Sequence, residues 1–294
     1  MIATTGPTVR AERRLAPTFL GLVAVLALWL APMRARADVS DIEHDSLATN
    51  GAVTIAWCAD ASVWVGEWDP FAHGWVSKTK VRAEERCDVS LRVARSGDAT
   101  ILAVGDLVHG SDDSHAVEIV RLERASNGLR ETAATKLASG FAASIVASAD
   151  AIVVASFEEL PRTPDARFVE KPAFGFQKMH VRALDPRTLA VVCGRTIYGH
   201  GGLRPHQVAA ISGRALAMVG GTLFVGVPDD KPRMATFELP TLRPTGERVL
   251  STHTGSRSSW FTSVVLVRNG ATVGAGLDPP APTAAVKEAI ATLP

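Results

Sequence analysis

The sequence predicts an all-β fold, a β-propeller of five four-stranded blades, with a β-sandwich as the alternative. Three observations predict it: a hairpin phrase recurs, strands come in groups of four, and helical periodicity is nearly absent. Each copy of the phrase is a strand, a short turn and a second strand that usually ends in a small pair such as Val-Gly. The copies lie at residues 57–66, 95–105, 147–156, 219–226 and 268–276. Repetition at intervals of roughly 50 residues is typical of radially repeated β-structure.

A third and a fourth strand follow most copies of the hairpin. Residues 116–123 alternate with a period of two before the turn Ser126-Asn127-Gly128. Similar pairs of strands occur at residues 179–184 and 189–192, and at 234–239 and 247–250. Segment 38–49 is expected at the outer edge of the first or last blade, where it would close the ring. Residues 283–293 could form a third strand of the last blade or a short helix.

One of these strand pairs carries a family resemblance. The segment Val181-Arg182-Ala183-Leu184-Asp185-Pro186-Arg187-Thr188-Leu189 resembles the outer-strand signature of bacterial quinoprotein-like and related exported propeller repeats. In those families a strand ends in Asp-Pro-x-Thr before the next strand begins. The other units lack this turn, and the Trp and Gly pattern of quinone-binding repeats is absent. The resemblance therefore implies an architecture only, and the cofactor stays unknown.

The N-terminal 37 residues have the pattern of a cleavable signal peptide. Three arginines at positions 10, 13 and 14 precede an apolar stretch from Phe19 to Leu30. Ala35-Arg36-Ala37 then places small residues where a signal peptidase reads them, so cleavage is expected before Asp38. The pattern predicts a periplasmic or extracellular protein with a single domain over residues 38–294, which contacts a membrane only during export.

Charge and cysteine content limit the kinds of partner and the disulfides that the chain can have. The formal net charge is +1 with the signs interspersed, which excludes the basic stripe of a nucleic-acid-binding protein. Three cysteines, Cys58, Cys87 and Cys193, permit one disulfide in an oxidising compartment. Cys58 and Cys87 are nearest in sequence, but the predicted layout puts them at opposite ends of their strands, so the pairing stays open.

The predicted strand order sorts the polar residues by face. Loops between the second and third strands and between blades share one face, and the short hairpin turns share the other. The tightest cluster on the long-loop face is His109, Asp112 and His115, a candidate metal site. His200 and His206, between the third and fourth blades, are candidate ligand-binding residues.

Aromatic residues give a second candidate site. Trp68 and Trp75 flank a predicted long-face loop that contains Asp69 and His73, and Trp260 would begin a neighbouring inner strand once the ring closes. Aromatic rings beside carboxylates can stack on sugars or cationic ligands. Bulky core filler is the competing interpretation of the same tryptophans.

These features favour an exported propeller that binds a small ligand, a glycan or a protein, without catalysis. The sequence lacks a Gly-x-Ser-x-Gly elbow, a phosphate-binding loop and a His-Glu-x-x-His motif. The alternative is a polysaccharide-acting hydrolase with carboxylates at the propeller funnel. Asp60, Asp98 and Asp150 recur at equivalent hairpin turns, where Asp is favoured for turn geometry, and are interpreted as structural.

Overall fold

The computed structural model describes most of the chain that follows residue 43. The chain divides into two units, Met1–Asp38 and Val39–Pro294, and all described residues belong to the second. The predicted signal peptide lies outside the described residues. These are 44–49, 52–83, 87, 89–106, 116–138, 141–159, 176–201, 215–227, 233–249, 263–266, 273–276 and 284–293.

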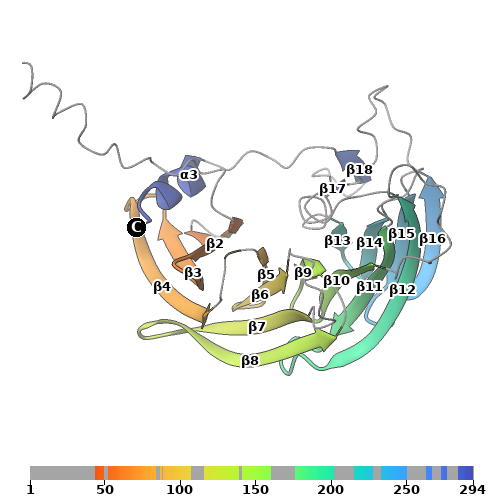
Figure 1. Cartoon of the computed structure of the whole chain (residues 1–294), viewed down its shortest axis with the longest axis horizontal. Coiled ribbons are helices and arrows are strands. Elements are labelled where there is room, and N and C mark those ends of the chain that lie inside the picture. The colour runs from red at the N-terminus through yellow and green to blue at the C-terminus, as the bar shows by residue number, and fades with distance from the viewer. Residues whose placement is uncertain are drawn as a thin grey trace, which may run out of the picture. The chain divides into compact units, whose positions relative to one another are not determined.

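The described strands form four four-stranded antiparallel sheets and one two-stranded sheet, each ordered as in the chain (Figure 1). This confirms the predicted four-strand unit, whereas five complete blades and a closed ring are not confirmed. The first sheet contains β1 (His44–Thr49), β2 (Ala52–Ala59), β3 (Ser62–Asp69) and β4 (Gly74–Ala83). The second contains β5 (Val89–Ser96), β6 (Ala99–Asp106), β7 (Ala116–Ala125) and β8 (Gly128–Ala138).

The remaining elements continue the series. The third sheet contains β9 (Phe141–Ala147), β10 (Ile152–Glu159), β11 (Phe176–Leu184) and β12 (Val191–Gly201). The fourth contains β13 (Leu216–Val219), β14 (Thr222–Val227), β15 (Arg233–Glu238) and β16 (Arg243–Val249), and the fifth β17 (Ser263–Leu266) and β18 (Val273–Gly276). Residues Ala284–Ala291 form α3, so the helical alternative for the C-terminal segment is confirmed. No helix in the described residues is long and apolar enough to cross a membrane.

Successive sheets pack face to face, and this explains why their inner strands are apolar on both sides. In β5, Val89, Leu91 and Val93 pack against the first sheet, whereas Ala94 packs against the third. Successive residues of a strand point to opposite faces, so burial on both faces needs continuous apolar runs. The outer strands of the first two sheets are linked by ion pairs instead. Arg82 Nη2 lies 2.8 Å from Glu118 Oε1, and Arg82 Nη1 lies 2.6 Å from Glu131 Oε2.

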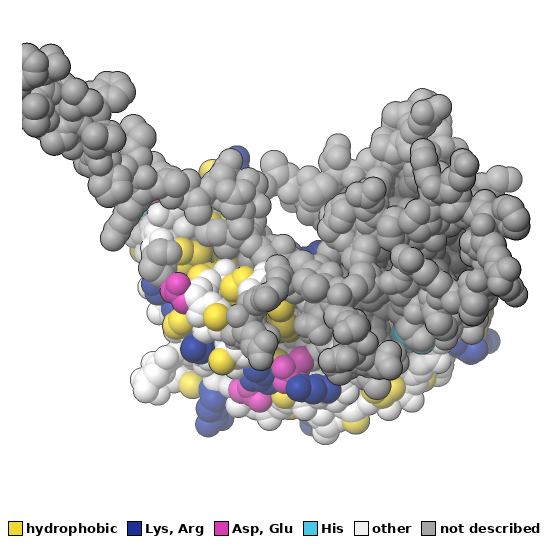
Figure 2. Space-filling view, viewed as in Figure 1, with side chains coloured by type: hydrophobic (Ala, Val, Ile, Leu, Met, Phe, Trp, Pro, Cys, Tyr) yellow, Lys and Arg dark blue, Asp and Glu magenta, His cyan; other side chains and the backbone are white. Residues whose placement is uncertain are grey.

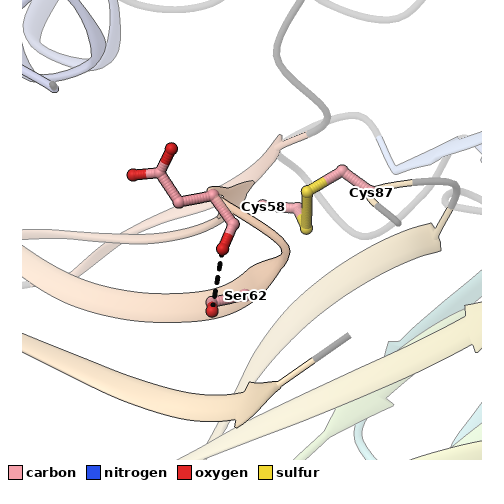
Figure 3. Close-up of a disulfide and its surroundings, with 4 residues drawn as sticks. Cys58, Ser62 and Cys87 are labelled. Atoms are coloured by element: carbon pink, nitrogen blue, oxygen red, sulfur yellow. Dashed lines mark hydrogen bonds between the residues drawn. A yellow bond between two sulfur atoms is a disulfide. The ribbon is translucent and has the colours of Figure 1, made fainter. Parts of the chain in front are cut away.

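The inner strands run in the same direction. Ser96, the last residue of β5, donates from Oγ to the carbonyl of Ser148, which follows β9, at 2.7 Å. Cys58, near the end of β2, is bonded to Cys87, which precedes β5 (Figure 3). Since the start of β1 pairs with the end of β2, these contacts place the starts of β1, β5 and β9 together. We term this the upper end of the sheets, and the opposite one the lower end.

The first hairpin departs from the prediction. It was expected as an inner pair, but it is the β2–β3 pair, because β1 precedes it as the inner strand. The prediction that segment 38–49 lies at an outer edge is therefore wrong for its described part, residues 44–49. The shift by one strand inverts the first sheet: the turn at Asp60 and Ala61 lies at the upper end, and loop 70–73 at the lower. It also brings Cys58 beside Cys87, whose Cα atoms are 5.5 Å apart.

Candidate functional site

Acidic residues from three consecutive sheets lie at the upper end. Asp45 is the second residue of β1, Asp106 is the last of β6, and Glu158 and Glu159 end β10. The backbone register fixes these positions, since Asp45 pairs with Ala56, Asp106 with Val89 and Glu158 with Lys178. β1 is innermost in its sheet, and β6 and β10 are second in theirs. We define these four residues as the upper acidic set.

A polar seam lies below this set, between the second and third sheets. Ser90 of β5 and Ser156 of β10 are both fully buried. Arg182 of β11 donates from Nη1 to Ser156 Oγ at 3.2 Å, and the half-buried Arg92 follows Ser90 on the same face of β5. Within the described part of the chain, Ser90 Oγ is buried without a hydrogen-bond partner. Buried polar groups destabilise a fold unless they are bonded, so this seam does not stabilise the packing of the two sheets as aliphatic side chains would.

The seam places a cation near one of the acidic positions. A strand rises about 3.3 Å per residue, so position 158 is about 7 Å along β10 from Ser156, where the Arg182 guanidinium binds. Carboxyl groups in different electrostatic surroundings can divide the roles of acid and base.

The predicted aromatic site is at the lower end instead, against α3. Trp68 is 1% exposed and packs edge to face on Trp75, with ring centroids 5.4 Å apart. Trp75 donates from Nε1 to Thr292 Oγ1 at 2.8 Å, and His73 Nδ1 lies 2.8 Å from Glu288 Oε1. Both partners follow or belong to α3, so intramolecular contacts account for Trp75 Nε1 and His73 Nδ1, whereas the buried Trp68 Nε1 has no hydrogen-bond partner among the described residues.

Asp69 is part of the loop that carries His73. Its Oδ1 accepts the backbone N–H groups of Phe71 at 2.8 Å and Ala72 at 3.0 Å. Both hydrogen bonds lower the pKa of the Asp69 carboxyl, and the bond from Ala72 has the larger effect. The structure brings Trp68, Asp69, His73 and Trp75 together, as predicted, but at the opposite end of the sheet. Their role in ligand binding stays a prediction, and Trp260 lies outside the described residues.

The predicted histidine sites fall mostly beyond the described part of the chain. His109, Asp112 and His115, the candidate metal ligands, and His206 all lie there. His200 is the last but one residue of β12, which places its backbone at the upper end of an outer strand. Among the residues that the structure does describe, no three His, Cys, Asp or Glu side chains group as metal ligands.

The other acidic residues have structural partners or turn positions. Glu67 is buried near the lower end, where its Oε2 lies 2.7 Å from Arg124 of the second sheet. Asp98 and Asp150 occupy lower turns, as predicted, whereas Asp60 occupies an upper turn with φ 49°. Figure 2 shows basic and acidic side chains interspersed over the described surface rather than gathered by sign.

The Asp-Pro-x-Thr turn, which carries the family resemblance, lies between two outer strands, as the resemblance implies. Asp185 to Thr188 connect β11 to β12, the third and fourth strands of their sheet. Asp185 Oδ1 accepts bonds from Thr188 N at 2.7 Å, Thr188 Oγ1 at 2.9 Å and Arg187 N at 2.9 Å. These bonds, from Thr188 first, lower the pKa of the Asp185 carboxyl and fix the turn.

Comparisons with known proteins give remote structural likeness only. No family model and no curated protein matches the chain. Among solved structures, a GH43_1 enzyme from Xanthomonas citri complexed with xylotriose is 13% identical, with 78% of each chain covered and a TM-score of 0.41. A xylan beta-1,4-xylosidase from Bacillus halodurans C-125 is 13% identical over 78% of this chain and 47% of its own, with a TM-score of 0.40.

A third similar structure is a subtype N10 neuraminidase-like protein of A/little yellow-shouldered bat/Guatemala/060/2010, 9% identical over 71% of this chain and 58% of its own, with a TM-score of 0.41. The first two are named as enzymes that act on sugars. The prediction of a propeller without catalysis is not retained, because these two structures are of enzymes. At these identities and TM-scores, the likeness carries no activity over to this chain.

Proposed function

We propose that this protein is a glycoside hydrolase acting on a polysaccharide or oligosaccharide. The observation that carries the proposal is the upper acidic set, Asp45, Asp106, Glu158 and Glu159, drawn from the inner strands of three consecutive sheets. Glycosidic bonds are cleaved by two carboxyl groups, one protonating the leaving oxygen and one acting as base or nucleophile. Acids on separate rigid strands can provide such a pair.

The positions of these acids support a catalytic role over a structural one. Asp and Glu are depleted in strands, yet Asp45 and Glu158 lie inside β1 and β10. The structural acids of this fold are elsewhere: Asp185 fixes a lower turn and Glu67 pairs with Arg124.

Substitution of the four acids tests the proposal. The purified mature protein is assayed on a panel of chromogenic aryl glycosides and plant and bacterial polysaccharides. With Asp45→Asn, Asp106→Asn, Glu158→Gln and Glu159→Gln, we expect at least two variants to lose about 10²–10⁴-fold in kcat with unchanged thermal midpoints. Asp98→Asn and Asp150→Asn, in lower turns, are the matched controls and keep full activity.

Two results contradict the proposal. One is a folded wild-type protein that hydrolyses nothing on the panel. The other is hydrolysis that persists at the wild-type rate in all four variants.

We also propose that the protein is exported as a five-bladed propeller, with β17 and β18 as the inner strands of the fifth blade. The Cys58–Cys87 disulfide supports export, because such bonds persist in oxidising compartments. Mass spectrometry of protein recovered from the periplasm or medium should give an N-terminus at Asp38. Recovery of the intact Met1 terminus from the cytoplasm would contradict it.

A further inference from the structure

The C-terminal helix covers one face of the first sheet. Val286, Ala289 and Ile290 of α3 are buried, and they form one hydrophobic cluster with four residues of β2 and β3: Val53, Ile55, Trp57 and Trp68. Their spacing of three and four residues is that of a single apolar helix face. Figure 1 shows α3 beside β2 and β3. The helix thus joins the end of the chain to the sheet nearest its beginning.

Polar contacts fix how α3 sits on the sheet. Glu288 bonds His73, and Thr292, just after the helix, accepts the Trp75 indole N–H. Thr292 Oγ1 also donates to the Ala289 carbonyl at 2.7 Å, which holds the helix end against the Trp75 ring. The helix is therefore oriented by its apolar face and also by two hydrogen bonds, to His73 and to Trp75, which lie more than 200 residues away in sequence.

The sheet and the helix depend on each other. The opposite face of the first sheet packs on the second sheet through Ala56, Cys58, Val63 and Val65. Its α3 face carries Trp57 and Trp68, 2% and 1% exposed, whose rings would meet water without the helix. An isolated helix of eight residues is unstable in water, so α3 forms where this face stabilises it.

We propose that α3 is a latch that fixes the first sheet, and with it β1 and Asp45, in place at the upper acidic set. The sheet's α3 face receives one occupant, residues 284–293 of the same chain. Among the described strands, β1 pairs with β2 alone, and the residues of β2 pack against the helix. The consequence for catalysis rests on the proposed function, whereas the latch itself does not.

Two full-length variants with the same change of charge test the latch. Ile290→Asp puts a carboxylate into the apolar cluster, and Ala291→Asp puts one on the exposed side of the adjacent position. We expect Ile290→Asp to shift tryptophan emission to longer wavelength, to raise acrylamide quenching and to lose amide protection in β2 and β3. Ala291→Asp should match the wild type in all three, and protection in the third sheet should persist in both.

A milder variant covers the case in which Ile290→Asp fails to fold. Ile290→Ala only shortens the side chain, and we expect a smaller shift of the same emission and quenching signals. Wild-type quenching and wild-type protection of β2 and β3 in both Ile290 variants would overturn the latch.

Activity assays separate the packing of α3 on the first sheet from its effect on Asp45. Hydrolysis lost in Ile290→Asp and kept in Ala291→Asp supports the fixing of Asp45 by α3. If the tryptophans become exposed while hydrolysis stays at the wild-type rate, that fixing is refuted. Should the acid-to-amide variants show no catalysis to lose, the proposed function fails while the fluorescence and exchange results still decide the latch.

Discussion

At the scale of single residues, the contact between Gly66 and Trp75 sets the packing of the first sheet. A Cβ at Gly66 would lie 2.6 Å from the Trp75 ring and 2.7 Å from the backbone oxygen of Ser77. The indole therefore lies directly over a strand position that has no side chain. This places its N–H where Thr292 accepts it, so one glycine in β3 decides how α3 is anchored.

Gly66→Ala should destabilise the protein by about 1–3 kcal/mol, because the added methyl group must displace the ring or the strand. Gly194→Ala is the control, since it is also in a strand and its nearest neighbours lie 3.7 Å away. The measurement is the free energy of unfolding from urea titration of both variants. Equal free energies for the two variants would refute the close contact.

At the scale of elements, the disulfide links the first two sheets at their upper end. Cys58 and Cys87 are separated by 29 residues, and Ser62 Oγ donates to the Asp60 carbonyl in the turn beside them (Figure 3). The remaining thiol, Cys193, donates to the Pro240 carbonyl at 2.9 Å, and burial raises its pKa. Only the bonded pair restrains the unfolded chain.

Reduction of this bond should lower stability by about 3–4 kcal/mol, the loop-closure value for its length. The check is the thermal midpoint of the wild type, of Cys58→Ser/Cys87→Ser and of Cys193→Ser, each with and without dithiothreitol. We expect the reductant to act on the wild type and on Cys193→Ser only. A wild-type midpoint that ignores the reductant, under conditions that release two thiols, would contradict the link.

Strand patterns predicted most elements of this fold, and one segment assigned to the wrong edge of its sheet changed which loops of that sheet share a face. The hairpins at residues 95–105, 147–156 and 219–226 are the inner pairs of their sheets, as expected. β1 reads His-Asp-Ser-Leu-Ala-Thr, too short and polar for an apolar or alternating pattern. With this segment placed at an outer edge, the prediction made the first hairpin the inner pair, exchanged the two ends of that sheet and set Cys58 apart from Cys87.

At the scale of the whole molecule, strand order puts the four acids at the same end of three consecutive sheets, which makes them a candidate site. Asp106 and Glu158 each follow a repeated hairpin, and this recurrence is a signal that the sequence does carry. Asp45 has no such signal, because its segment was expected at an outer edge rather than as the inner strand β1. The recurrent acids that the sequence does show are those of the hairpin turns, and they were interpreted as structural. The sequence also predicted one ligand site from Trp68, Trp75 and Trp260. It could not foresee that α3 would contact these tryptophans, since a short helix takes its place from tertiary packing.

The proposed catalytic centre requires carboxyl groups from different sheets to lie close together. A crystal structure of the mature protein that resolves the side chains of Asp45, Asp106, Glu158 and Glu159 measures this directly. We predict at least one pair of carboxyl groups, from different sheets, about 5–9.5 Å apart and open to solvent. If every such pair is more than about 10 Å apart, the proposed catalytic centre does not exist.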